Sequence, residues 1–259
     1  MSTEGEMNRE KLVQTWQDEE QKSFTGWDFS YLDGRMIEEQ SPWSYLARAA
    51  ELMQRSSAVL DMGTGGGERL LEMRENWPEK VLVTENYSPN VKLAEQCLGP
   101  LGVKVVNVSL TRDGLMPFGN GEFDLVLNRH SGLNCAEVAR ILAPGGVFLT
   151  QQIHGLWAQD LLAEFGASPQ WPDATPEYYV PGLEAAGLTV EKMEEWDGRL
   201  AFCDVGAVVY YLKAIPWLVP GFSVEMHADN LMGLQERLKC EGELVFSASK
   251  YLIEARKVN

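Results

Sequence analysis

A glycine-rich turn near residue 60 carries residue types that could bind a nucleotide. An apolar run ends at Asp61, and every second residue after Met62 is then a glycine: Gly63, Gly65 and Gly67. Glycine lets the backbone approach a ligand closely, and the free N–H groups of the following helix point into the same space. A buried strand that leads into such a turn and then into a helix predicts a nucleotide cradle.

The spacing of the glycines separates two classes of nucleotide. A dinucleotide fingerprint needs glycine at its first, third and sixth positions. Counted from Gly63, the sixth position is Glu68, and a carboxylate at a helix N-terminus would repel a pyrophosphate. The same carboxylate is tolerable beside a ligand that carries an ammonium and a sulfonium. The turn therefore favours such a ligand over a dinucleotide.

A second carboxylate fits the ribose of a nucleoside. Glu85 follows the apolar segment 80–84. The carboxyl ends of parallel strands meet at one edge of a sheet, where an acid can accept hydrogen bonds from both ribose hydroxyls. Glu85 would suit NAD equally well, so this residue alone does not separate the two ligands.

Four motifs in order over about residues 55–152 resemble those of class I S-adenosylmethionine-dependent methyltransferases. They are the turn that begins at Asp61, the acid Glu85, Phe-Asp-Leu-Val at 123–126, and Leu-x-Pro-Gly-Gly at 142–146. The whole chain also resembles a group of bacterial methyltransferase-like proteins with Asn-Arg-His after the fourth strand and Asp-Val-Gly-Ala-x-Val-Tyr-Tyr-Leu near the C-terminus. This group implies no particular substrate.

The resemblance implies that S-adenosylmethionine is the cofactor. Many members of the family have an aspartate after the third strand that accepts from the adenine amino group, and here Ser109 is expected to substitute while the Leu110 backbone donates to the ring. The expected cofactor-binding residues are Asp61, Gly63, Thr64, Gly65, Gly67, Glu85, Asn86, Ser109, Leu110 and Asn128.

Methyl transfer needs little acid or base machinery, because the sulfonium is already a good leaving group and the protein mainly aligns the nucleophile and excludes water. A base is needed only for a protonated acceptor. His130 follows the fourth strand, where related enzymes face the methyl group, so it is the candidate catalytic base. Alternatively, His130 only hydrogen-bonds the loop or the cofactor. Arg129 could hold a substrate carboxylate or pair with a nearby acid.

Composition limits the class of partner. The 259 residues, 45% hydrophobic and 23% charged, are typical of a soluble globular enzyme. A net charge of −16 without a basic cluster makes nucleic acid an unlikely partner and favours a small-molecule acceptor. The apolar runs are too short for a membrane span and the N-terminus lacks a signal sequence, which predicts a cytoplasmic location. Four widely spaced cysteines suggest neither disulfides nor structural zinc, and no metal is expected.

The alternation of strand and helix patterns predicts an α/β fold with a doubly wound, seven-stranded, mostly parallel sheet of the Rossmann-like methyltransferase type. Residues 1–57 are expected to form an N-terminal helical cap, with a second helix capped by Ser41 and started by Pro42. Residues 58–197 would form the cofactor-binding core and 244–259 its final strand. Residues 198–243 would be a helical insertion between strands six and seven.

The aromatic content of this insertion suggests a lid that closes over the acceptor together with the aromatic stretch 24–31. The expected substrate-binding residues are Trp27, Phe29, Arg129, Gln151, Arg199 and Tyr211. A homodimer interface is the alternative to a lid, so the chain is expected to be a monomer or a homodimer. Two other functions stay open: an NAD-dependent oxidoreductase and a non-catalytic regulatory protein that binds S-adenosylmethionine.

Overall fold

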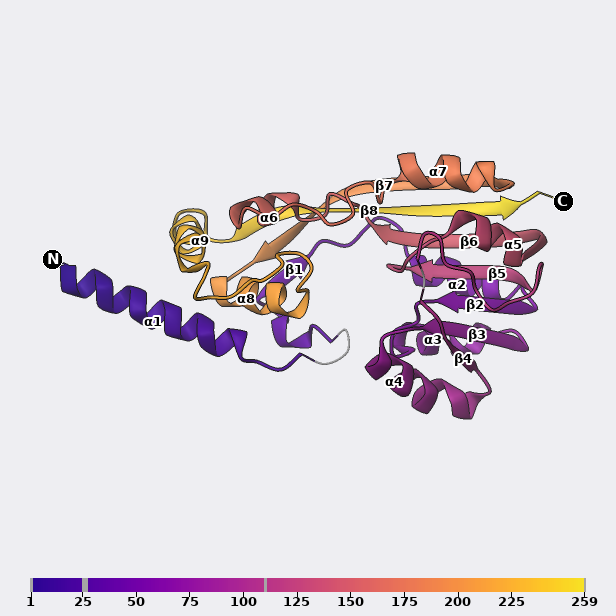
Figure 1. The fold of residues 1–259 in the computed structure, drawn as a ribbon, viewed down its shortest axis with the longest axis horizontal. Helices are drawn as coiled ribbons and strands as arrows, with labels where there is room; N and C mark the ends of the chain where they lie inside the picture. Colours follow the sequence, from indigo (N-terminus) through magenta and orange to yellow (C-terminus); the bar gives the residue numbers. More distant parts are fainter. Residues whose placement is uncertain (1, 25–27, 110, 259) are drawn as a thin grey trace. The chain divides into compact units, whose positions relative to one another are not determined.

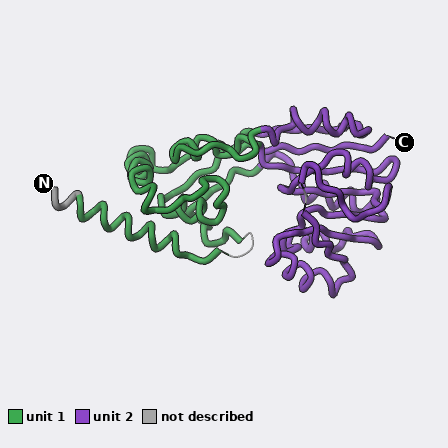
Figure 2. Tube along the Cα trace, viewed as in Figure 1, with its two compact units in different colours: residues 1–40, 155–172, 197–249 green, residues 41–154, 173–196, 250–259 purple. Residues whose placement is uncertain are grey.

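The computed structural model describes residues 2–24, 28–109 and 111–258. The chain folds into two compact units, each made of separate stretches of sequence (Figure 2). Unit 1 comprises residues 1–40, 155–172 and 197–249, and unit 2 comprises 41–154, 173–196 and 250–259. The predicted cap is thus divided between the units at residue 40, and the predicted insertion belongs to unit 1.

Over the described residues, the sheet has eight strands in the order β1-β7-β8-β6-β5-β2-β3-β4 (Figure 1). Strands β2 to β6 pair in parallel, whereas β8 pairs antiparallel with β6 and β1 antiparallel with β7. The α/β, mostly parallel fold is confirmed, with β1 as one strand more than the seven predicted. The strands are β1 Met36–Glu38, β2 Ala58–Met62, β3 Lys80–Glu85, β4 Lys104–Asn107, β5 Phe123–Arg129, β6 Leu142–Ile153, β7 Leu188–Phe202 and β8 Leu244–Lys257.

Helices alternate with the strands of the core, as the sequence pattern predicts. The α-helices are α1 Ser2–Glu20, α2 Tyr45–Met53, α3 Glu68–Glu72, α4 Ser88–Leu98, α5 Cys135–Ile141, α6 Gln159–Glu164, α7 Pro176–Ala185, α8 Val205–Ala214 and α9 Ala228–Glu241. Short 3-10 helices cover Ser30–Leu32, Arg74–Asn76 and Gly99–Leu101. Within the described ranges, no helix combines the length and apolar character that a membrane crossing requires.

The start of α2 corrects one sequence prediction. The helix begins at Tyr45, and its N-cap is Ser44, whose hydroxyl accepts a hydrogen bond from the backbone N–H of Ala47 at 3.2 Å. The Ser41 hydroxyl instead donates to the carbonyl of Trp43. The prediction of Ser41 as the cap was therefore wrong. Three more non-helical residues follow Ser41, so the unpaired N–H groups of the first helical turn lie too far along the chain for its side chain to cap.

Unit 2 buries both faces of its central strands, which explains their nearly continuous apolar sequence. Helices α2, α3 and α4 pack on one face through a cluster that includes Met53, Leu70 and Leu98. Helices α5 and α7 pack on the other face through a cluster that includes Val138 and Leu183. Helices on both faces leave the carboxyl edge of the parallel strands as the place where polar side chains gather.

Unit 1 has its own core of aromatic and aliphatic side chains. Trp16 of α1, Phe202 of β7 and Phe246 of β8 are almost fully buried in it, and nearly every residue of α8 is buried. The Asp204 carboxylate caps α8 through the N–H of Ala207 at 2.7 Å and accepts from Arg35 at 2.6 Å.

The aromatic residues that suggested a lid are mostly part of this core. Phe202, Tyr210, Tyr211 and Phe222 are each less than 10% exposed, whereas Trp217 is 37% exposed. Packing within unit 1 therefore accounts for most of the aromatic content of the insertion. Closure over an acceptor stays a prediction.

Candidate functional site

The glycine-rich turn after β2 has a backbone that few other residues could adopt. The φ angles are 67° at Gly63, 66° at Gly65 and 92° at Gly67. A side chain disfavours this left-handed region, so the alternate spacing of the glycines follows from the shape of the turn. A Cβ at Gly67 would also lie 2.8 Å from the side chain of Leu98, so this glycine lets α3 pack against α4.

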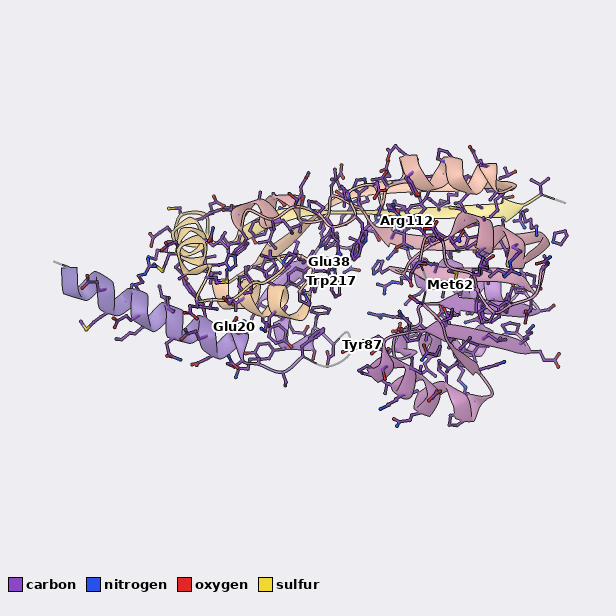
Figure 3. The ribbon with its side chains drawn as sticks, viewed as in Figure 1. Glu20, Glu38, Met62, Tyr87, Arg112 and Trp217 are labelled. Carbon is purple, nitrogen blue, oxygen red and sulfur yellow. The ribbon has the colours of Figure 1, made fainter. Side chains whose placement is uncertain are left out.

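Glu85, at the end of β3, holds this turn. One carboxylate oxygen accepts from the N–H of Gly65 at 2.8 Å, and the other accepts from the N–H groups of Asn86 at 2.8 Å and Tyr87 at 2.9 Å. The side chain is only 7% exposed. Each carboxylate oxygen can accept more than one hydrogen bond, so the oxygen that meets Gly65 keeps capacity for a further donor. Figure 3 labels two residues near this edge: Met62, the last residue of β2, and Tyr87, which lies two residues after the end of β3.

Asp61 is partly buried at the end of β2, and burial raises the pKa of its carboxyl to about 6. The Thr64 hydroxyl and the Arg129 guanidinium act in the opposite direction, and the charge of Glu85 adds to the rise. Tyr45, in α2, lies close to the Asp61 carboxyl. Burial raises the pKa of the Tyr45 phenol, and the nearby charge of Asp61 raises it further. Asp61, Thr64 and Glu85, which were predicted to bind the cofactor, are therefore neighbours.

Two hydroxyls beside Asp61 are buried and make no hydrogen bond of good geometry among the described residues. They are the hydroxyls of Tyr45 and Thr64. A buried polar group without a partner carries a desolvation cost, so each hydroxyl is placed to bond a ligand or water at this edge. Tyr45 was missed by sequence reasoning, since nothing local distinguishes it from a core aromatic of an amphipathic helix.

Two further predicted cofactor residues meet after β3 and β4. The Asn86 side-chain amide donates to the Ser109 hydroxyl at 3.3 Å. Both residues are exposed. Leu110, predicted to donate to the adenine ring, lies outside the described residues.

Asn128, at the end of β5, is fully buried in a polar network. Its side-chain nitrogen donates to the Gly132 carbonyl at 3.1 Å, and its oxygen accepts from the Gln152 amide at 2.5 Å. Gln152 also donates to the Thr150 hydroxyl at 2.8 Å. Both ends of the Asn128 amide are thus engaged inside the protein, where they hold the segment that leads to Arg129 and His130.

His130 has a strained backbone and a fixed ring orientation. Its φ angle of 56° is rare for a residue with a side chain. The Trp43 indole N–H donates to Gln151 Oε1 at 2.8 Å, and Gln151 Nε2 lies 3.2 Å from His130 Nε2. An indole nitrogen can only donate, so Gln151 must accept with its oxygen and donate with its nitrogen. His130 Nε2 is therefore the acceptor, and the hydrogen of the neutral ring is on Nδ1.

The surroundings of His130 disfavour the charged imidazolium. Although its side chain retains solvent access, removal of water by the surrounding protein lowers its pKa well below 6.5, and the charges of Arg129, Lys250 and Arg69 lower it further. Lys250, in β8, is only 8% exposed, which is rare for lysine. Sequence reasoning missed Lys250, although a lysine inside an apolar strand pattern is a usable signal.

The remaining predicted substrate residues lie in unit 1. The Tyr211 hydroxyl accepts from the Trp157 indole at 3.1 Å, and the ring of Phe29 lies 6.1 Å from that of Tyr211. Arg199 is exposed and pairs with Glu39 at 3.4 Å. Trp27 lies outside the described residues. Phe29 and Tyr211 are thus neighbours, while Arg129 and Gln151 belong to unit 2.

The core of the chain is similar to known protein domains. Residues 60–150 match a family model described as a methyltransferase domain. A solved protein from Bacillus halodurans C-125, described as a candidate methyltransferase, is 19% identical with a TM-score of 0.58, over 83% of this chain and 97% of that one. No curated protein matches the chain.

Two further solved structures extend the comparison. A candidate sarcosine dimethylglycine methyltransferase from Galdieria sulphuraria is 16% identical with a TM-score of 0.51, over 83% of this chain and 84% of that one. The 4+2 cyclase SpnF is 16% identical with a TM-score of 0.51, over 86% of each chain. At these identities the structures show a shared fold, and SpnF shows that the fold also hosts a cyclase. Residues 60–150 thus match the model of a methyltransferase domain, and the chain shares the Rossmann-like fold of solved methyltransferases.

Proposed function

We propose that this protein transfers a methyl group from S-adenosylmethionine to a nitrogen, oxygen or carbon atom of a small molecule. The observation that carries the proposal is the placement of Asp61 and Glu85 around the left-handed glycine turn, at the carboxyl edge of the parallel strands. Ligands of doubly wound sheets bind at this edge.

The residues at this edge suit such a cofactor in charge and in hydrogen bonding. Two carboxylates, Asp61 and Glu85, complement a ligand that carries an ammonium and a sulfonium. The buried hydroxyls of Tyr45 and Thr64 offer additional polar contacts. When bound, the cofactor supplies the electrophilic methyl group and the sulfur leaving group.

Each residue has a role that follows from its place. Glu85 would accept from the ribose hydroxyls, and Asp61 would attract the α-ammonium. Asn86, Ser109 and Leu110 would meet the adenine. Gly63, Thr64, Gly65 and Gly67 shape the turn, and Asn128 holds the loop that carries His130.

On the acceptor side, His130 would meet the nucleophile. In the observed network, Nδ1 is the hydrogen-bond donor, so His130 can orient an acceptor oxygen or nitrogen. To act as a base, Nε2 would exchange its bond to Gln151 for the acceptor's proton. Arg129 would hold an acidic group of the acceptor together with Gln151. Substrate binding by the predicted lid residues Trp27, Phe29, Arg199 and Tyr211 stays a prediction from the sequence.

The small-molecule class rests on charge. A net charge of −16 disfavours a polyanionic acceptor. A cytoplasmic location and a monomeric or homodimeric state stay predictions from the sequence.

Calorimetry with S-adenosylhomocysteine and NAD separates the candidate functions. We expect binding of S-adenosylhomocysteine and none of NAD. Methyl-labelled S-adenosylmethionine is then incubated with the protein and a metabolite extract, and we expect a labelled small molecule. Binding of NAD alone would establish the oxidoreductase alternative instead. Cofactor binding without any labelled product would favour a regulatory protein.

A further inference from the structure

Three potential metal ligands meet at one place in unit 2. His154 follows the end of β6, Glu177 lies in the first turn of α7, and Glu195 lies in β7. Their ligand atoms all lie within 4.8 Å of one another, and the distance from His154 Nε2 to Glu195 Oε1 is 4.0 Å. The side chain of His154 is 16% exposed, whereas that of Glu195 is 44% exposed. The cluster therefore has a partly buried side and a side open to solvent.

The composition of the cluster suits a divalent transition metal. One imidazole and two carboxylates are ligands that Mn²⁺, Fe²⁺ and Zn²⁺ accept, and three protein ligands leave coordination positions for water or another ligand. Bonds of about 2.0 to 2.2 Å place the donors roughly 3 to 4 Å apart, a separation that small rotations of the two exposed glutamates can reach. A divalent ion would also offset the mutual repulsion of the two carboxylates.

A buried hydroxyl beside the cluster is an independent sign of a ligand. Tyr251 is fully buried, and its hydroxyl has no hydrogen-bond partner among the described residues. Its ring meets the His154 imidazole edge to face, with 6.3 Å between the ring centroids. A water bound to a metal would give this hydroxyl the partner it lacks.

We propose that His154, Glu177 and Glu195 bind one divalent transition-metal ion, with the Tyr251 hydroxyl bonded to a water on that ion. The proposal goes beyond methyl transfer and does not depend on it, because metal binding is measured without cofactor or acceptor. The sequence predicted no metal, since the three ligands come from three separate elements.

The test is a titration of the chelator-treated full chain with Mn²⁺, followed by electron paramagnetic resonance, with Zn²⁺ as competitor. We expect one saturable Mn²⁺ site that Zn²⁺ displaces. Loss of even an outer-shell partner of a metal typically costs about 10- to 100-fold in affinity, so His154→Ala, Glu177→Gln and Glu195→Gln should each weaken binding at least about tenfold.

Glu184→Gln is the matched control, because Glu184 is an exposed glutamate on the same helix as Glu177 and lies outside the cluster. It should bind Mn²⁺ like the wild type. Circular dichroism of each metal-free variant verifies that it is folded. Absence of a saturable site, or equal Mn²⁺ affinity in the wild type and all three cluster variants, would overturn the proposal.

Discussion

The two units bury different kinds of side chain. Every buried polar or charged residue within the described ranges belongs to unit 2: Thr84, Glu85, Asn90, Asn128, Glu137, Thr150, Gln151, Gln152, Lys250 and Glu254. The core of unit 1 is aromatic and aliphatic, and its ion pairs, such as Arg35 with Asp204, lie outside that core. Burial of a polar group is costly unless it is bonded, so unit 2 carries a cost that unit 1 avoids.

Not all of these polar groups belong to a site. Glu137 accepts from Arg140 and from the backbone of Met116, and Glu254 accepts from Arg48 at 2.6 Å, which are structural pairs. In contrast, three of the buried polar residues lie in strands, at or near the carboxyl edge of the parallel strands: Glu85, Gln151 and Lys250. We therefore expect the cofactor at this edge of unit 2, and each prediction below can contradict or refine that expectation.

The largest expected effect is on the stability of unit 1. Phe202 is fully buried and packs against Tyr211 and Phe246 at centroid distances of 5.4 and 6.2 Å. Phe202→Ala should lower the free energy of unfolding by about 3 to 5 kcal/mol through lost burial and a cavity. Urea unfolding measures this loss. Calorimetry of the folded variant should still show the wild-type affinity for S-adenosylhomocysteine, and a large loss of affinity would mean that unit 1 takes part in cofactor binding.

The next effect concerns cofactor affinity in unit 2. Glu85→Ala should weaken S-adenosylhomocysteine binding by about 1 to 3 kcal/mol, because charge-assisted hydrogen bonds are lost. Glu85→Gln keeps one acceptor oxygen and should recover part of the affinity. Glu72→Ala, an exposed glutamate on α3 that pairs with Arg69, is the matched control and should bind normally. An unchanged dissociation constant in Glu85→Ala would remove this residue from the site.

The sequence predicted these residues because they lie in continuous local patterns. Asp61, the three glycines and Glu85 follow strands whose apolar runs are unmistakable, and their order alone places them at one edge. Tyr45, Trp43 and Lys250 were not predicted, because their relation to the site depends on tertiary packing between α2, β6 and β8. The same reason explains why His154, Glu177 and Glu195 were not recognised as a cluster.

Unit 1 was harder to foresee for a different reason. It is assembled from three stretches of sequence, and β1 has only three residues, too few for a period to be recognised. An aromatic-rich helix such as α8 has the same composition whether it packs in a core or closes over a ligand. Composition alone therefore does not separate a packed core around Tyr211 from a lid, and closure over an acceptor stays a prediction.

A smaller effect should appear in the pH dependence of cofactor binding. Asp61, with a pKa of about 6, is neutral below that pH and ionised above it. The cofactor's ammonium prefers the ionised form, so affinity should rise with pH, and S-adenosylhomocysteine should bind about three- to tenfold more weakly at pH 5 than at pH 7. Calorimetry across this range gives the profile. Asp61→Asn should flatten it, and a wild-type profile without a rise near pH 6 would exclude contact between Asp61 and the ammonium.

The smallest effect is the tautomer of His130, which tests whether the edge of unit 2 is organised before any ligand binds. One hydrogen bond from Gln151 holds Nε2 as an acceptor, and a bond of about 1 kcal/mol corresponds to roughly a fivefold preference for hydrogen on Nδ1. Nitrogen-15 resonances of labelled histidine should show this tautomer at pH 7, with a pKa below 6.5 because desolvation and nearby cations disfavour the imidazolium. Trp43→Phe removes the indole donor that orients Gln151, so its amide can turn and the preference should shrink. A ring protonated on Nε2 at pH 7 in the wild type would show that this network does not form, and that His130 offers Nδ1 as its free base instead.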